Sequence, residues 1–166
     1  LRLRVLGRSC HGAYPESGTD AIVISAQIVT ALQTLVSRGI SPLDSAVLSL
    51  GTVQGGTANN VICGEVLLTG TLRTLSEKTR KELKCRIPRL AQGIAQGMGG
   101  EAEVAIQPGY GAVYNDDALY AQVEDLAREM LGAERVVRRE APSLGVESFS
   151  FFVQRVPGVY YDLGCG

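Results

Sequence analysis

Histidine and cysteine are scarce in this sequence, and tryptophan is absent. The 166 residues contain one histidine, four cysteines and no tryptophan. Zinc hydrolases that hold their metal within one chain usually take two or three ligands from histidine, so one histidine excludes a self-contained centre of that kind. The cysteines form no C-x-x-C pair, which argues against a structural zinc site or a redox motif. They are also too few for a disulfide scaffold, so a reducing, cytoplasmic location is expected.

An excess of basic charge and a long apolar run are missing as well. Sixteen Lys and Arg residues stand against 17 Asp and Glu, a net charge of −1, whereas nucleic-acid-binding domains are usually clearly basic. The longest mostly apolar stretch, residues 21–32, carries Ser25, Gln27 and Thr30, so no membrane span is expected. The chain opens in a strand-like alternation without an initiator Met or a signal-peptide pattern. We therefore expect it to be part of a longer protein.

The periodicity of apolar residues predicts an α+β fold for residues 1–108. Strands are expected at 1–8, 45–53, 64–75 and 101–107, and helices at 20–38 and 76–98. In the third strand Val66, Leu68, Gly70 and Leu72 share one face, and Thr69, Thr71 and Arg73 share the other. The order strand-helix-strand-strand-helix-strand is that of a ferredoxin-like βαββαβ sandwich, an antiparallel sheet with two helices on one face.

A second region begins at the natural boundary Pro108-Gly109. Here we expect a helix at about 116–131, a short strand near 135–138, a helix near 146–154 and an apolar strand at 158–163. Residues 1–108 carry a net charge of +3, and residues 109–166 carry −4. About 55 residues seldom hold a core unaided. Residues 109–166 should therefore pack on the first domain or on sequence outside this chain.

Three residues of the first domain have side chains suited to a binding or catalytic site. His11 follows the first strand on a loop shaped by glycine and proline, where it can donate a hydrogen bond to an oxyanion or simply bind nearby backbone. Asn60 lies in the stretch 55–62, which begins with two glycines. Its side chain can offer both a donor and an acceptor, or the stretch can simply connect a hairpin. Arg73 can hold a carboxylate bidentately or remain an ordinary strand arginine.

Glu147 is the candidate in the second region. It lies in the expected first turn of a helix, where a carboxylate interacts favourably with the helix dipole, and that structural role is sufficient to explain it.

Several short motifs occur together in a characteristic order. They are Gly7-x-x-x-His11-Gly12-Ala13-x-Pro15, Gly18-Thr19-Asp20-Ala21, Ser37-Arg38, Pro42-Leu43-Asp44, Gly55-Gly56-Thr57-Ala58-x-Asn60-Val61-Ile62, Gly70-Thr71-Leu72-Arg73-Thr74, Tyr110 to Asp116, Gly145-x-Glu147-x-Phe149-Ser150 and Val156-Pro157-Gly158. With this set the chain resembles the dinuclear-metal amidohydrolases of the aminoacylase/carboxypeptidase metallopeptidase family, in the branch of hippurate hydrolases, N-acetyl-amino-acid deacetylases and auxin-conjugate hydrolases. The match covers the lid, or dimerisation, domain (1–108) and an incomplete C-terminal part of the catalytic domain (109–166).

The resemblance implies roles for the four candidate residues. The histidine matching His11 reaches from one subunit's lid into the partner's active site and stabilises the tetrahedral intermediate, and the asparagine matching Asn60 lines the same site. The arginine matching Arg73 grips the substrate carboxylate, and the glutamate matching Glu147 lies near the metal cleft. Two divalent ions (zinc, manganese, cobalt or nickel) are implied for the full-length protein, with ligands outside these 166 residues and none bound by this chain.

The expected function is therefore part of a metal-dependent hydrolase of N-acyl amino acids, dipeptide-like compounds or related amides, inactive as an isolated chain. A homodimer through the lid is implied, by way of an edge strand at 64–75 or 45–53. A nucleic-acid or membrane partner is not expected. The alternative is a non-catalytic ferredoxin-like module for small-molecule binding or dimerisation, which composition and strand order allow equally.

Overall fold

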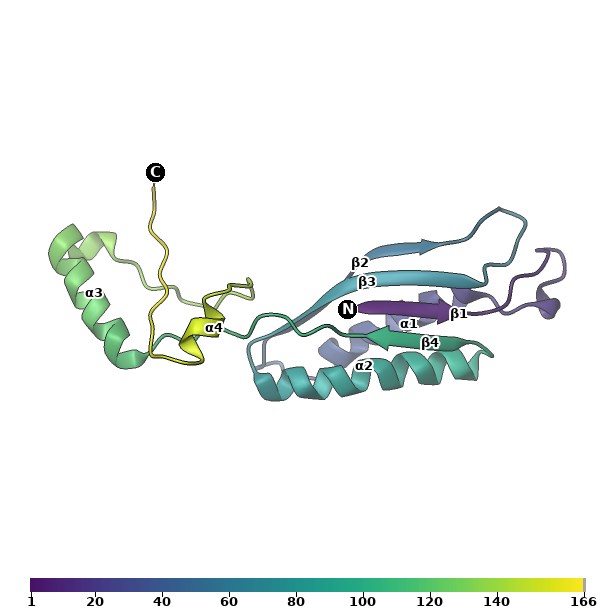
Figure 1. Ribbon diagram of the computed structural model, residues 1–166, viewed down its shortest axis with the longest axis horizontal. Helices are drawn as coiled ribbons and strands as arrows, with labels where there is room; N and C mark the ends of the chain where they lie inside the picture. Colours follow the sequence, from purple (N-terminus) through teal and green to yellow (C-terminus); the bar gives the residue numbers. More distant parts are fainter. Residues whose placement is uncertain (166) are drawn as a thin grey trace. The chain divides into compact units, whose positions relative to one another are not determined.

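The computed structural model describes residues 1–165. They fall into two compact units, unit 1 (Leu1–Pro108) and unit 2 (from Gly109 onward) (Figure 1). Unit 1 contains four strands, two long helices and one short 3-10 helix. In chain order they are β1 (Arg2–Leu6), η1 (Pro15–Ser17), α1 (Ala21–Ser37), β2 (Ala46–Gly55), β3 (Glu65–Thr74), α2 (Glu77–Gly97) and β4 (Glu101–Ala105). No helix among the described residues is long and apolar enough to cross a membrane.

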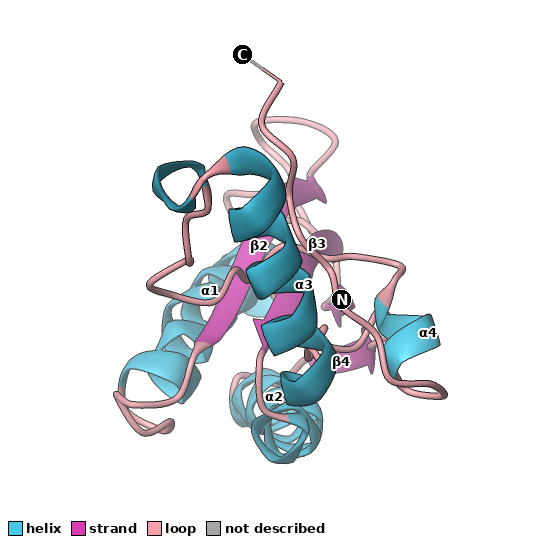
Figure 2. Cartoon of the chain, turned by 90° about the vertical axis from the view of Figure 1, so that its left-hand side faces the viewer, coloured by secondary structure: helices cyan, strands magenta, loops and turns pink. Residues whose placement is uncertain are grey.

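The four strands form one antiparallel sheet in the order β2-β3-β1-β4. Helices α1 and α2 pack against each other and cover one face of the sheet (Figure 2). The predicted α+β class and the two-layer βαββαβ arrangement are thereby confirmed. The sheet order also corrects one expectation. The strand at 64–75 is not an edge strand, because β3 lies between β2 and β1, whereas β2 does lie at an edge.

Polar caps fix where the two long helices begin. The Asp20 carboxylate accepts hydrogen bonds from the backbone N–H groups of Ile22 (2.8 Å) and Val23 (3.3 Å) at the start of α1. The Ser76 hydroxyl accepts one from the N–H of Thr79 (3.3 Å) at the start of α2. Such caps satisfy donors that the first helical turn leaves unpaired. Both helices begin within one residue of the predicted position.

The core lies between the sheet and the two helices. Its largest fully buried apolar side chains come from alternate positions of the central strands and from helix positions four residues apart. They are Leu3 and Val5 of β1, Val66 and Leu68 of β3, Ile24, Ile28 and Leu32 of α1, and Leu83 and Ile87 of α2. The inward face predicted for the third strand is confirmed for Val66 and Leu68.

A β-bulge at Gly51 interrupts the pairing of β2 with β3. Leu50 pairs with Gly70 and Thr52 pairs with Thr69, so Gly51 has no partner in the register. The extra residue switches the alternation of β2. Even-numbered residues before the bulge and odd-numbered residues after it lie on the sheet face that carries Val66 and Leu68 of β3. On the outer face the Thr52 and Thr69 hydroxyls hydrogen-bond at 2.6 Å.

Unit 2 contains α3 (Asp117–Leu131), η2 (Ala133–Arg135) and the single turn α4 (Ser150–Val153). The helix predicted at 116–131 is confirmed, but the one near 146–154 is reduced to that turn. The prediction of strands near 135–138 and at 158–163 is wrong, because neither segment forms a strand. The physical reason at 158–163 is that the N–H and C=O of Tyr160 bond the Asn115 side chain, at 2.8 and 3.0 Å, instead of a neighbouring strand.

A charged cluster replaces an apolar core in unit 2. Glu124 of α3 is 7% exposed and accepts hydrogen bonds from Arg128, one turn along α3, and from Arg138 in the following segment. These two arginines, Arg138 first, lower the pKa of the Glu124 carboxyl to about 2. Every buried apolar side chain in the described part of the chain belongs to unit 1. Unit 2 thus lacks an apolar core of its own within those residues, as its length led us to expect.

Candidate functional site

Two loops meet at the end of the sheet where β1 finishes and β3 begins. The loop after β1 pairs with the hairpin that joins β2 to β3, through Gly12 N–H to Asn60 C=O (2.7 Å) and Ile62 N–H to Cys10 C=O (2.9 Å). His11 lies opposite Val61 in this short antiparallel bridge. A Cβ atom on Gly12 would lie 3.0 Å from the Asn60 oxygen, so glycine allows the close approach. His11 and Asn60, 49 positions apart in sequence, are thus brought together.

The His11 side chain is exposed at this end. Its Nδ1 atom accepts a hydrogen bond from the N–H of Ala13 at 3.1 Å. The imidazole ring also lies beside the Tyr14 ring, with centroids 5.8 Å apart and planes tilted by 49°. The backbone partner considered from the sequence is therefore present, and it engages only one of the two ring nitrogens.

Arg73 lies at the other end of β3. It pairs with Val47 of β2, on the outer face that also carries Thr69 and Thr71. It lies eight positions along the strand from Glu65, where β3 begins beside the His11 loop. At about 3.3 Å per residue this strand length is about 26 Å. A small substrate held by Arg73 cannot reach His11 or Asn60 of the same chain.

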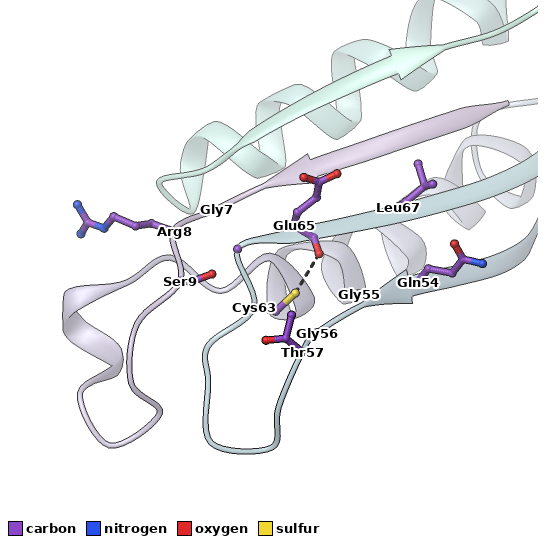
Figure 3. A pocket seen from close by; sticks show the side chains of 11 residues that line it. Gly7, Arg8, Ser9, Gln54, Gly55, Gly56, Thr57, Cys63, Glu65 and Leu67 are labelled. Atoms are coloured by element: carbon purple, nitrogen blue, oxygen red, sulfur yellow. Dashed lines mark hydrogen bonds between the residues drawn. The ribbon is translucent and has the colours of Figure 1, made fainter.

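An open hollow of about 730 Å³ adjoins the paired loops (Figure 3). Ser9 of the loop after β1 faces Cys63 and Thr57 of the hairpin across it. The Cys63 thiol donates a hydrogen bond to the Glu65 backbone oxygen at 3.0 Å. The Glu65 carboxylate accepts two hydrogen bonds from Arg4, at 2.8 and 2.9 Å. The hydroxyls of Ser9 and Thr57 were not singled out from the sequence, because isolated hydroxyls in glycine-rich loops carry no distinguishing pattern.

Glu147 is held by hydrogen bonds within unit 2. One carboxylate oxygen accepts from the Phe149 N–H and the Ser148 hydroxyl, and the other accepts from the Tyr160 hydroxyl, all at 3.2 Å. The Phe149 N–H is the largest of the causes that lower the pKa of the Glu147 carboxyl. The negative charge in turn raises the pKa of Tyr160. Glu147 is therefore a fixed, ionised carboxylate at neutral pH.

Comparison with known families gives a match over residues 1–96 to the peptidase dimerisation domain of the M20 peptidases. The chain belongs to the M20 peptidase family. The resemblance inferred from the sequence motifs is thereby confirmed. N-acetyldiaminopimelate deacetylase of Halalkalibacterium halodurans is 35% identical over 164 residues, which is 99% of this chain and 44% of the relative. The chain spans about two fifths of the length of the curated relatives it matches.

Solved structures of M20 proteins share the fold. The YXEP protein of Bacillus subtilis, a dinuclear metal-binding peptidase of the M20 family, superimposes with a TM-score of 0.70 at 30% identity, over 95% of this chain and 38% of that one. A Staphylococcus aureus protein gives a TM-score of 0.81 at 29% identity, over 95% of this chain and 40% of its own. Both likenesses extend over nearly all of this M20 chain.

A dinuclear metal centre does not fit the residues of this M20 chain alone. Among residues 1–165 no group of three or more His, Cys, Asp or Glu side chains could hold a metal ion. The three donors around the Glu147 carboxylate leave it arranged for hydrogen bonding rather than as a member of a ligand cluster. We therefore assign no metal ligand to this chain.

Proposed function

We propose that this chain is the lid, with an adjoining part of the catalytic domain, of a homodimeric metal-dependent amidohydrolase. Its substrates would be N-acyl amino acids, dipeptide-like compounds or related amides. Membership of the peptidase dimerisation family and similarity to a deacetylase and to a dinuclear metal-binding peptidase support the proposal. The metals, of the zinc, manganese, cobalt or nickel group, would be held by the rest of the protein, and cytoplasmic action is part of the proposal.

The observation that carries the proposal is the separation of the two ends of β3. His11 and Asn60 share one end and Arg73 occupies the other, a strand length of about 26 Å away. If all three residues act on one small substrate, they must come from two chains. A two-fold dimer meets this requirement when each active site takes Arg73 from one subunit and the paired loops from its partner.

Each residue then has a role that suits its chemistry. The exposed His11 ring donates a hydrogen bond to the oxyanion that forms as the amide carbonyl is attacked, and Asn60 beside it adds a second polar contact. The Arg73 guanidinium binds the substrate carboxylate through two parallel N–H donors. Glu147 supplies a fixed negative charge near the metal cleft, since its hydrogen bonds keep it ionised.

Mixing two inactive variants of the full-length protein tests this division of labour. The His11→Ala protein should lose hydrolysis of an N-acetyl amino acid by at least about 100-fold, as expected when an oxyanion donor is removed. The Arg73→Ala protein should also lose hydrolysis, because the substrate carboxylate is no longer held by two N–H donors. Unfolded and refolded together, they should recover about a quarter of wild-type activity, because half of the dimers are mixed and each mixed dimer has one intact site of two.

A matched control comes from two residues on the same end. His11→Ala mixed with Asn60→Ala should recover nothing, because both residues reach a given site from the same subunit. Recovery in this control, or none in the His11→Ala and Arg73→Ala mixture, would contradict the arrangement. A full-length protein without any amide hydrolysis would instead favour the non-catalytic binding module.

A further inference from the structure

The turn that carries His11 donates a hydrogen bond to one nitrogen of the imidazole ring, Nδ1. The chain reverses between His11 and Tyr14, where the Tyr14 N–H donates to the His11 carbonyl at 2.9 Å. Within this turn the Ala13 N–H donates to Nδ1 of the ring at 3.1 Å. The Tyr14 ring lies against the imidazole, with a centroid distance of 5.8 Å. The ring is therefore held by the residues of its own turn.

The bond from Ala13 has a consequence for the proton on the ring. A neutral imidazole has one protonated nitrogen, which donates, and one unprotonated nitrogen, which accepts. A backbone N–H is only a donor, so the Nδ1 atom that faces it must be the acceptor. The proton then resides on Nε2. With Nδ1 protonated, two donors would face each other and the hydrogen bond would be lost.

We propose that the backbone N–H of Ala13 fixes His11 in the Nε2–H tautomer, so that the exposed nitrogen is a hydrogen-bond donor. Ala13 is thus a positioning residue, acting through His11. The functional importance of this tautomer rests on the proposed function, in which Nε2 donates a hydrogen bond to the developing oxyanion. With the opposite tautomer the ring would present a lone pair to the oxyanion and repel it.

The backbone on both sides of the exposed His11 is held by the bridge to the hairpin. His11 lies between two backbone hydrogen bonds, from Gly12 to Asn60 and from Ile62 to Cys10. The Cys10 thiol adds a contact to the Tyr14 carbonyl at 3.3 Å, which closes the base of the turn. These contacts hold the main chain on both sides of His11, and the exposed Nε2 atom is left for a ligand.

Nitrogen-15 NMR of the 166-residue chain tests the inference without any catalytic assay. The chain contains one histidine, so its ring signals need no assignment by mutagenesis. At a pH where the ring is neutral, Nδ1 should show the shift of an unprotonated nitrogen and Nε2 that of a protonated one. A scalar coupling across the hydrogen bond should join Nδ1 to the Ala13 amide. Exchange-averaged shifts that indicate comparable tautomers, or a proton on Nδ1, would overturn the inference.

Two variants isolate the backbone group. Ala13→Pro removes the N–H, and the ratio of Nε2–H to Nδ1–H tautomer should fall by about two- to tenfold, the range for losing one ordinary hydrogen bond. Ala13→Ser keeps the N–H and should retain the wild-type ratio. An unchanged ratio in a folded Ala13→Pro chain would contradict the inference. If Ala13→Pro does not fold, the coupling between Ala13 and Nδ1 in the wild type decides alone.

Failure of the tautomer prediction and failure of the proposed function are separate outcomes. In the full-length protein, Ala13→Pro should lower kcat by about the factor by which the donor tautomer is depleted, with KM nearly unchanged. A full-length His11→Ala protein with wild-type activity would remove the proposed role of His11, yet it would leave the NMR result standing.

Discussion

Gly70 of β3 is a position where a single added methyl group should destabilise unit 1. It pairs with Leu50 immediately before the bulge in β2. A Cβ atom there would lie 2.1 Å from the backbone oxygen of Ser49 and 3.0 Å from Cα of Leu50. The first distance is about 0.9 Å shorter than the closest approach that Cβ atoms make. Because the obstacle is backbone, it cannot be relieved by turning a side chain.

The magnitude of the effect follows from the two ways in which the strands can respond. Forcing extra volume into a packed position costs about 1–3 kcal/mol. Moving β2 away loses ladder hydrogen bonds at about 1 kcal/mol each. We expect Gly70→Ala to lower the free energy of unfolding by about 2–4 kcal/mol. For a unit of about 100 residues this lowers the Tm by at least about 8 °C.

Gly51 provides the matched control for Gly70. It is the unpaired residue of the bulge, no atom lies within 4 Å of the place that a Cβ atom would take there, and it is not among the glycines with positive φ. Gly51→Ala should change the stability by no more than about 0.5 kcal/mol. Since both variants restrict the unfolded chain equally, their difference isolates the clash in the folded state.

Thermal and urea unfolding followed by far-UV circular dichroism measures both variants, because most of the regular structure lies in unit 1. A Gly70→Ala chain that unfolds at the same temperature as Gly51→Ala would refute the predicted clash. A loss of several kcal/mol in both variants would refute it too, since the loss would then come from any side chain in this part of β2 and β3 rather than from contact with Ser49.

Three further measurements concern polar groups. Arg138→Ala should raise the pKa of Glu124 from about 2 toward 4.5, which a carboxyl NMR titration measures. The pKa of Glu124 is lower in the folded chain than in the unfolded chain. The stability that Glu124 contributes is therefore complete above about pH 4.5 and is lost as the pH falls toward 2. Tyr160→Phe should raise the pKa of Glu147 but leave it below the ordinary value of 4.5, because the Phe149 N–H, the donor with the largest effect on this carboxylate, remains. Ser25→Ala should leave stability unchanged or raise it by up to about 1 kcal/mol in urea unfolding, since the Ser25 hydroxyl is buried without a partner; a loss above about 1 kcal/mol would contradict this.

The regular elements of unit 1 could be predicted from the sequence because their causes are local. The four-residue spacing of Ile24, Ile28 and Leu32 determines the inward face of α1, and Asp20 before them determines its start. The central position of β3 was harder to predict, because nothing in residues 64–75 alone indicates that β1 and β2 lie on either side of this strand. The bulge at Gly51 could not be predicted either, since it depends on the register of two strands.

In unit 2 the apolar pattern predicted strands that do not form, and the cause is physical. An apolar segment becomes a strand only when neighbouring backbone accepts and donates its hydrogen bonds. At Tyr160 the partner of the backbone N–H and C=O is the Asn115 side chain. For the candidate site, the sequence located His11 and Asn60 on separate loops. It did not indicate the backbone bridge between them or the Ala13 contact, which arise from folding.

The bulge in β2 has a consequence for changes in chain length. Because Leu50 and Thr52 already pair with adjacent residues of β3, removing Gly51 would leave the register and the facing of both neighbours as they are. Removing Gly55 instead would slip the end of β2 and the hairpin that leads to Asn60 by one position. Gly51 is thus a position in unit 1 at which one residue can be lost, in evolution or design, while the residues on either side keep their partners and their faces of the sheet.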